Sequence, residues 1–147
     1  MNEVKFSVYL ANEKAKIPIK AHSNDSGYDV YSCEEIIIPA GQWRGVSTGL
    51  HFKTPEGWEI CVRPRSGLAL KNGITVLNSP GTIDEAYTGE VKIILHNESN
   101  SDFKVSIGDR IAQIVMGPVY KTKIIPINVK PEKVARGDGG FGSTGVK

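Results

Sequence analysis

The chain of 147 residues has few cysteines, few histidines and no long apolar run. Its two cysteines, Cys33 and Cys61, lie far apart among apolar neighbours, with no second Cys or His at metal-ligand spacing. We expect two reduced core thiols rather than a disulfide framework or a metal site. No apolar stretch approaches the length of a membrane span, and the N-terminus lacks a charged-then-apolar signal pattern. These absences predict a cytoplasmic protein with no membrane partner.

The chain also lacks an excess of charge of one sign. It contains 18 Lys and Arg against 16 Asp and Glu, for a formal net charge of +2. The basic residues are scattered, so the basic stripe typical of proteins that bind nucleic acid directly is missing. The composition still allows a small anionic ligand, because local charge can matter where net charge does not.

What the chain does contain is turn signals at short intervals, such as the Pro-x-Gly turn at residues 55–57. Between the turns, apolar and polar residues alternate with period two, as in residues 4–10 and 91–95, and this alternation predicts β-strands. Only residues 66–71 are expected to form a short helix. We therefore predict one all-β domain over residues 1–135, a sandwich or barrel resembling a jelly roll.

The last residues, 136–147, break this alternation. Five glycines surround Phe141 between Arg136 and Gly145. Composition alone indicates a flexible tail. However, glycine lets backbone N–H groups approach phosphate closely, Arg136 supplies a charged donor, and Phe141 offers a face for a base. We therefore predict a C-terminal arm that could close over a nucleoside triphosphate.

A second unusual segment follows the strand predicted before Pro64. Residues 64–71 read either as a turn into a surface helix or as an anion site at the N-terminus of that helix, where unpaired N–H groups converge. The residues alone leave both interpretations open.

A third segment places Asp84 and Glu85 between Gly81 and Gly89. Acidic residues in a hairpin are usually solvated surface groups. A catalytic role gains weight because the sequence has no P-loop, no G-x-S-x-G elbow and no histidine pair at ligand spacing.

Five segments of the chain occur together and in a fixed order. They are Asp25-Ser-Gly-Tyr-Asp-Val30, Pro64-Arg-Ser-Gly-Leu-Ala69, Asn78-Ser-Pro-Gly-Thr-Ile-Asp-Glu-Ala-Tyr-Thr-Gly89, Gly108-Asp-Arg-Ile-Ala-Gln113 and Arg136-Gly-Asp-Gly-Gly-Phe-Gly-Ser-Thr-Gly145. With them the chain resembles, over nearly its whole length, the trimeric dUTPases. Ser26 and Ala86 depart mildly from the family pattern at positions to which no chemistry is assigned.

The resemblance implies a hydrolase that converts dUTP to dUMP and pyrophosphate by attack of water on the α-phosphate, with Mg²⁺ as cofactor. Such an enzyme keeps uracil out of DNA and supplies dUMP for dTMP synthesis. It also implies a homotrimer whose sites each draw on three subunits, with the arm closing over the shared site. Two alternatives remain: a dCTP deaminase on the same fold, for which Glu85 would be the acidic residue near the base, and a regulatory module that binds a protein partner.

The resemblance also assigns roles to individual residues. Asp84 is the expected general base. Tyr87 is expected to lie against the deoxyribose and to leave no room for a ribose 2′-hydroxyl. Uracil is expected to be bound by the Asn78 amide and by backbone groups near Gly81 and Val91.

The phosphates are expected to be bound from two other motifs and from the arm. Asp29 is expected to hold waters of a Mg²⁺ ion that the substrate phosphates bind, and Arg110 to support the first motif through an ion pair. Phe141 is expected to stack on uracil. The expected phosphate-binding residues are Arg65, Ser66, Gly67, Gln113, Arg136, Ser143 and Thr144.

Overall fold

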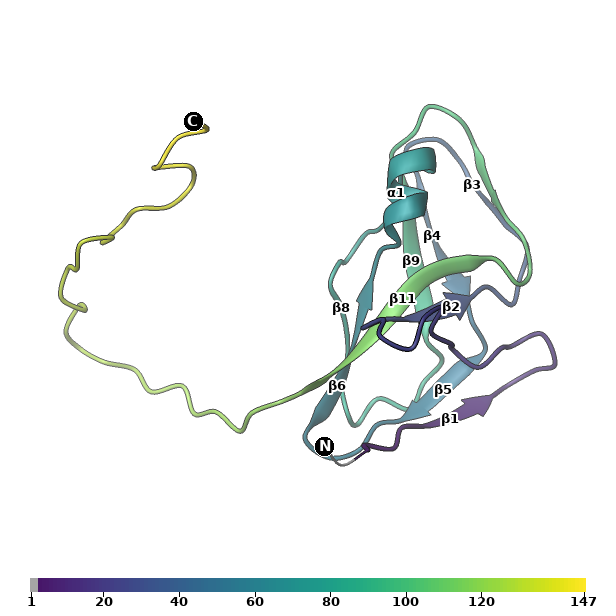
Figure 1. Cartoon of the computed structure of the whole chain (residues 1–147), viewed down its shortest axis with the longest axis horizontal. Helices are drawn as coiled ribbons and strands as arrows, with labels where there is room; N and C mark the ends of the chain where they lie inside the picture. The colour runs from purple at the N-terminus through teal and green to yellow at the C-terminus, as the bar shows by residue number, and fades with distance from the viewer. Residues whose placement is uncertain (1–2) are drawn as a thin grey trace.

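The computed structural model describes residues 3–147 and contains strands and a single short helix in this part of the chain (Figure 1). In chain order the elements are β1 (Ser7–Leu10), β2 (Tyr28–Tyr31), β3 (Ile36–Ile38), β4 (Trp43–Ser47), β5 (Leu50–Lys53), β6 (Trp58–Arg63), α1 (Ser66–Asn72), β7 (Ile74–Val76), β8 (Gly81–Ile83), β9 (Lys92–Asn97), β10 (Phe103–Val105) and β11 (Arg110–Pro118).

The strands form two larger sheets that enclose the core. One has the order β2-β11-β6-β8 and the other the order β4-β9-β7, and all pairings in both are antiparallel. Smaller pairs, β1 with β5 and β10 with β3, complete the body. The non-consecutive neighbours mean that the chain crosses between sheets repeatedly. The architecture confirms the predicted all-β, jelly-roll-like fold.

Alternation along the strands explains the core. On β6, Ile60 and Val62 are buried, and on β9, Ile93 and Leu95 are buried, while the residues between them face outward. Because successive side chains of a strand point to opposite faces, one apolar set from each sheet meets in the middle. Further fully buried side chains are Val30, Ile38, Val46, Leu50, Val105, Ile111 and Ile114.

The same alternation separates the two cysteines. Both are free thiols, as expected, and Cys33 is buried. Cys61 is only half-buried, because Ile60 and Val62 on either side of it point into the core and turn its thiol to the outer face of β6. The expectation of two core thiols therefore holds for Cys33 alone.

Helix α1 confirms the helix predicted at residues 66–71. It follows Arg65, which has an extended backbone, and ends at Gly73 with φ of 63°. In this left-handed conformation the Gly73 N–H bonds to the carbonyls of Leu68 and Ala69 and closes the last turn. None of the helix residues is fully buried, so α1 is a surface element beside the sheets.

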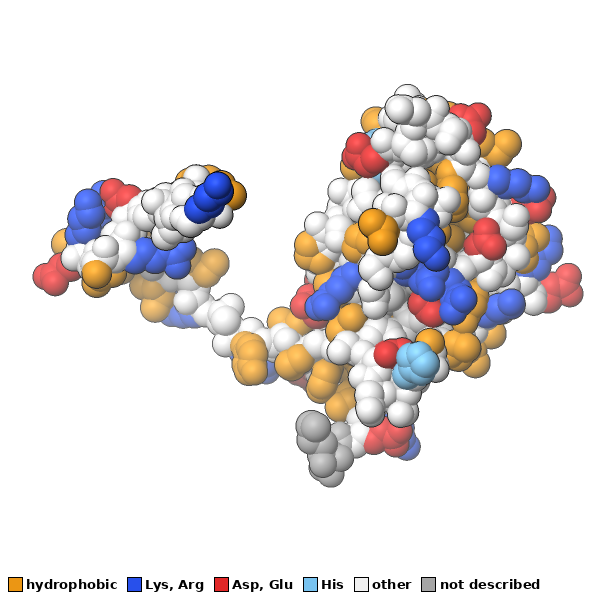
Figure 2. All heavy atoms as spheres, turned by 45° about the horizontal axis from the view of Figure 1, so that its top comes forward, with side chains coloured by type: hydrophobic (Ala, Val, Ile, Leu, Met, Phe, Trp, Pro, Cys, Tyr) orange, Lys and Arg blue, Asp and Glu red, His pale blue; other side chains and the backbone are white. Residues whose placement is uncertain are grey.

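Strand β11 ends at Pro118, and residues 119–147 form neither helix nor strand. This segment runs away from the body (Figure 1), and Figure 2 shows apolar and charged side chains along it. Ile124, Ile125, Ile127 and Val129 are all exposed. The extended stretch thus begins well before the glycine-rich arm predicted from residue 136. Within residues 3–147 no helix is long and apolar enough to cross a membrane.

Candidate active site

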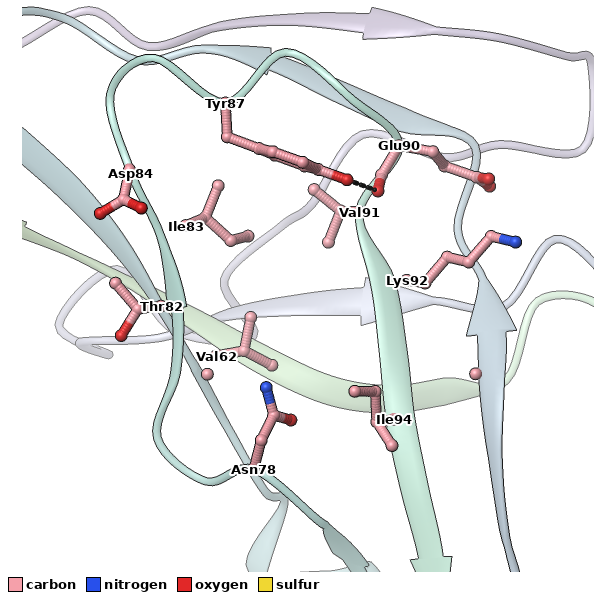
Figure 3. A pocket seen from close by; sticks show the side chains of 12 residues that line it. Val62, Asn78, Thr82, Ile83, Asp84, Tyr87, Glu90, Val91, Lys92 and Ile94 are labelled. Carbon is pink, nitrogen blue, oxygen red and sulfur yellow. Dashed lines mark hydrogen bonds between the residues drawn. The ribbon is translucent and has the colours of Figure 1, made fainter.

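A cavity of about 490 Å³ lies between β8, β9 and the loop that joins them, here called the β8–β9 loop (Figure 3). The hairpin expected around Asp84 is not formed, because β8 pairs with β6 in one sheet and β9 pairs with β4 and β7 in the other. Five of the residues predicted for uracil, sugar and catalysis line it: Asn78, Gly81, Asp84, Tyr87 and Val91. The wall is completed by residues that the sequence did not single out, namely Gly45, Val62, Thr82, Ile83, Glu90, Lys92 and Ile94.

The β8–β9 loop holds Tyr87 across one end of this cavity. The Tyr87 N–H donates to the Asp84 carbonyl at 3.1 Å, and the Tyr87 hydroxyl donates to the Glu90 carbonyl at 2.9 Å (Figure 3). The Tyr87 ring also lies directly on Gly89, where an added Cβ would come within 2.6 Å of the Tyr87 hydroxyl oxygen. Gly89 is therefore required for the ring to occupy this place.

Glu85 lies outside the cavity that contains its neighbour Asp84. Its Oε2 accepts a hydrogen bond from the Gly57 N–H at 2.7 Å, which connects the β8–β9 loop to the turn between β5 and β6. Asp84 lines the cavity and Glu85 does not. The carboxylate on which the deaminase alternative depends is thus directed away from the first cavity.

Glu90 was missed at the sequence level, although it lines the cavity directly after the third motif. Its Oε1 accepts hydrogen bonds from the Ser47 hydroxyl and from the Gly49 N–H, the latter at 3.0 Å. Burial raises the pKa of Glu90, but these two bonds and the charges of Lys92 and His51 outweigh burial and leave the pKa below its ordinary value of 4.5. Glu90 is therefore an ionised anchor at neutral pH.

A second cavity, of about 330 Å³, lies where β2, β11 and the start of α1 meet. It is lined by five of the residues expected near phosphate and magnesium: Asp29, Arg65, Ser66, Gly67 and Gln113. The segment 64–71, for which an anion site was one of two interpretations, thus lies beside the first and fourth motifs, which the β2–β11 pairing brings together.

Asp29 sits between two arginines in this cavity. Arg65 Nε lies 3.2 Å from Asp29 Oδ1, and Arg110 Nη1 lies 3.5 Å from Asp29 Oδ2. Arg65 also donates to the Arg110 carbonyl at 3.1 Å. The ion pair expected for Arg110 is present, and Asp29 has the further effect of orienting Arg65 toward the cavity that both residues line.

Gln113 is fixed by two contacts of different kinds. Its Nε2 donates to the Pro64 carbonyl at 2.9 Å. On the other side its Oε1 fills the space beside Gly27, where a Cβ would collide with it. Gly27 is therefore needed for the Gln113 side chain to keep this position.

The predicted residues of the arm line neither cavity. Arg136 Nε donates to the Gly139 carbonyl at 3.1 Å, and the Phe141 side chain is fully exposed. Ser143 and Thr144 lie in the same exposed turn. One chain thus divides the predicted site residues among three places: the first cavity, the second cavity and the arm.

Comparison with known proteins identifies the family. The dUTPase family model matches residues 13–145. The deoxyuridine 5'-triphosphate nucleotidohydrolase of Clostridium tetani is 48% identical over 145 residues, which cover 99% of each chain. The dUTPase of Staphylococcus bacteriophage 80alpha, solved with dUPNHPP, has the same fold, with a TM-score of 0.87 at 24% identity over 97% of this chain and 99% of that one. A mutant dUTPase of phage phi11 of S. aureus, whose structure describes a structural Mg(II) ion, covers 88% of this chain and all of its own, with a TM-score of 0.80 at 21% identity. The chain belongs to the dUTPase family.

Proposed function

We propose that this protein is a dUTP diphosphatase, which hydrolyses dUTP to dUMP and pyrophosphate. The observation that carries the proposal is the first cavity, which Asp84, Asn78 and Tyr87 line from different sides (Figure 3). A family model that spans residues 13–145 and a relative of nearly equal length named for this activity support it.

Asn78 and the backbone near Gly81 and Val91 bind uracil. The Asn78 amide points into the cavity (Figure 3), and Val62 closes the space behind Gly81. An amide and backbone groups that pair with the edge of uracil reject cytosine, because mismatched donors and acceptors are left unsatisfied. Tyr87 then closes the cavity against the sugar and excludes a ribose 2′-hydroxyl.

Asp84 is the general base. Its carboxylate accepts a proton from a water molecule as that water attacks the α-phosphorus, and the bond from the α-phosphorus to the bridging oxygen breaks to release pyrophosphate. A positioned base contributes about 10²–10⁴ to the rate. The larger part of the acceleration comes from binding the triphosphate and stabilising its developing charge.

The second cavity supplies the triphosphate contacts. Ser66, the Gly67 N–H and Gln113 bind phosphate oxygens. Arg65 neutralises phosphate charge, and Asp29 holds the Arg65 guanidinium in place. Asp29 also fits an outer-shell role toward Mg²⁺, because a carboxylate has about four acceptor positions and the two arginines leave some of them for metal-bound water. No cluster of three or more His, Cys, Asp or Glu suited to a metal occurs in residues 3–147. When bound with the triphosphate, Mg²⁺ neutralises phosphate charge and fixes the phosphate conformation.

The active species is a homotrimer in which three subunits build each site. The separation of the predicted residues into two cavities and an arm supports this arrangement. The exposed side chains of Ile124, Ile125, Ile127 and Val129 supply apolar surface that a second copy of the chain would bury. Arg136, Ser143 and Thr144 then bind phosphate, and Phe141 stacks on uracil in a neighbouring site.

Pyrophosphate release from dUTP, dCTP, dTTP and UTP, measured side by side with Mg²⁺, tests the proposal. We expect rapid release from dUTP and little from the other three. Ammonia release from dCTP would instead support a deaminase. Comparable rates with all four nucleotides would refute the specificity assigned to the first cavity.

A further inference from the structure

We infer that the Glu90 carboxylate is a positioning residue that fixes Tyr87 over the first cavity and thereby sets the discrimination between 2′-deoxyribose and ribose. This inference rests on the proposed function, because it concerns the sugar of the same nucleotide. The residue, Glu90, lies outside the five motifs. The evidence for its role is the hydrogen bonds that connect the β8–β9 loop to the turn after β4.

Tyr87 has little support of its own. It lies in the connection between β8 and β9, which has no helix or strand, and 47% of its surface is exposed. Among residues 3–147, its only hydrogen bond beyond its own turn is the one from its hydroxyl to the Glu90 carbonyl, at 2.9 Å. The position of the ring therefore depends on the position of the Glu90 backbone.

The Glu90 side chain fixes that backbone. Through Oε1 it accepts from the Ser47 hydroxyl at the end of β4 and from the Gly49 N–H in the turn that follows. Ser47 is held from its other side, because its N–H donates to Glu34 Oε1 at 2.7 Å. Glu90 thus connects Tyr87 to a turn that is itself anchored, by hydrogen bonds to an ionised acceptor.

Other hydrogen bonds that hold the β8–β9 loop involve Val91 and Thr88 rather than Tyr87. Val91 is held by Thr48, whose hydroxyl donates to the Val91 carbonyl at 2.5 Å, and by its own N–H, which donates to Leu50 at 2.8 Å. His51 Nδ1 lies 3.0 Å from the Thr88 carbonyl. These contacts keep the β8–β9 loop folded and Val91 in place without Glu90. The Val91 N–H and the Glu90 carbonyl belong to one planar peptide group, so the bond to Leu50 holds this carbonyl from the Val91 side, and the Glu90 carboxylate holds it from the other side.

Loss of the Glu90 carboxylate should therefore let Tyr87 recede while the uracil contacts remain. A 2′-hydroxyl needs only a small extra space, and displacements of about 1 Å are large on the scale of enzyme specificity. The kcat/KM for UTP should therefore rise relative to the kcat/KM for dUTP. A general loss of stability would lower the activity toward both nucleotides together.

The test measures kcat/KM for dUTP and for UTP in the parent, E90A, E90Q and S47A. We expect the dUTP-to-UTP ratio to fall at least roughly tenfold in E90A, the effect of losing charge-assisted hydrogen bonds. The ratio should fall less in E90Q, because glutamine keeps an acceptor oxygen. Ser47 does not line the cavity, so a reduced ratio in S47A has to be transmitted through Glu90.

E35A is the matched control, because Glu35 is an exposed carboxylate paired with Lys104 at 3.7 Å and lies outside both cavities. Its ratio should equal that of the parent. In the double variant S47A/E90A the dUTP-to-UTP ratio should be the same as in E90A, because both substitutions remove the same hydrogen bond.

A ratio unchanged in both E90A and S47A would overturn the inference. If E90A does not fold, unchanged ratios in S47A and E90Q would overturn it equally. A parent that does not hydrolyse dUTP would refute the proposed function itself. A parent that hydrolyses dUTP and UTP with equal kcat/KM would also overturn the inference, because there would be no discrimination for Glu90 to set.

Discussion

Arg65 and Asp29 form the closest ion pair of the second cavity, with 3.2 Å between Arg65 Nε and Asp29 Oδ1. They come from segments far apart in the sequence, joined because β2 and β6 flank β11 in one sheet. Through this pair the Asp29 carboxylate determines where the Arg65 guanidinium, proposed above to bind phosphate, points.

D29N should therefore weaken use of the triphosphate. Asparagine keeps the shape of the side chain but loses the charge that holds Arg65 and the acceptor for metal-bound water. We expect kcat/KM for dUTP to fall roughly tenfold or more, with a higher Mg²⁺ concentration needed for half-maximal activity. D25N is the control, because Asp25 lines the same cavity but bonds to the His22 N–H at 2.8 Å and has no arginine partner. Equal effects of the two substitutions would contradict the role of Asp29.

D84N should lower turnover at least about a hundredfold while folding and dUTP binding stay nearly unchanged. Asparagine keeps hydrogen-bonding reach but cannot accept a proton. Turnover is measured by pyrophosphate release and binding by titration with a non-hydrolysable dUTP analogue. E85Q, beside it in sequence but tied to Gly57, should stay close to the parent. Turnover of D84N within a few-fold of the parent would rule Asp84 out as the base.

Two inactive variants should restore activity when mixed, if each site draws on different subunits. The pair is D84N and a chain that lacks residues 136–147. Under conditions that allow subunit exchange, some mixed trimers contain a complete site, and pyrophosphate release should reappear. A chain with both changes, mixed with D84N, supplies no Asp84 and should give no recovery. Full activity of a monomer, identified by light scattering, would refute a shared site.

The arm should become ordered only over the complete substrate. Fixing a glycine-rich backbone costs roughly 1–2 kcal/mol per residue. Stacking of Phe141 offsets this cost by about 1–3 kcal/mol, and phosphate contacts of Arg136 add to it only when the triphosphate is present. Amide exchange of residues 136–147 should slow with the dUTP analogue and Mg²⁺ but not with dUMP. Amides of β6 and β11 serve as the reference. Equal protection in all states would mean that the arm does not gate the site.

The lowered pKa of Glu90 predicts a pH-dependent contribution to stability. Because the folded-state pKa lies below the unfolded value near 4.5, the contribution is fully present above that value and is lost as pH falls through the folded pKa. The parent should melt at a higher temperature than E90Q at pH 7, and the difference should shrink below pH 4.5. The comparison needs melting curves of both proteins from pH 3 to pH 7. A constant difference over this range would contradict the ionised anchor.

The fold could be predicted from the sequence because its signals are local. Period-two alternation in residues 91–95 predicted the strand found at Lys92–Asn97, and the segment before Gly73 predicted α1. The observed ends of strands differ from the predicted ends where pairing with another strand determines them. Strand β1 begins at Ser7 rather than at residue 4, because its pairing with β5 starts there.

The candidate site was predictable only where motifs mark it. Asp84 and Tyr87 stand inside such a motif. Glu90 binds Ser47, 43 residues away in sequence, and Glu85 binds Gly57, 28 residues away. No local pattern encodes such contacts, because they depend on how β4, β5 and β6 are placed beside the β8–β9 loop. The separation of the site into two cavities likewise follows from the sheet order.

The packing of Gln113 against Gly27 affects how sequence variation in this protein will be interpreted. Gly27 offers no functional group, yet alanine there would push aside the Gln113 amide that faces the second cavity. In a deep mutational scan, substitutions at position 27 should therefore lower activity although Gly27 has no side chain of its own, and larger residues should lower it more than alanine. A missense variant at Gly27 would thus lower activity by displacing a neighbour, without removing any functional group, and a smaller residue at position 113 would not rescue it, because the phosphate contact proposed for Gln113 would be lost as well.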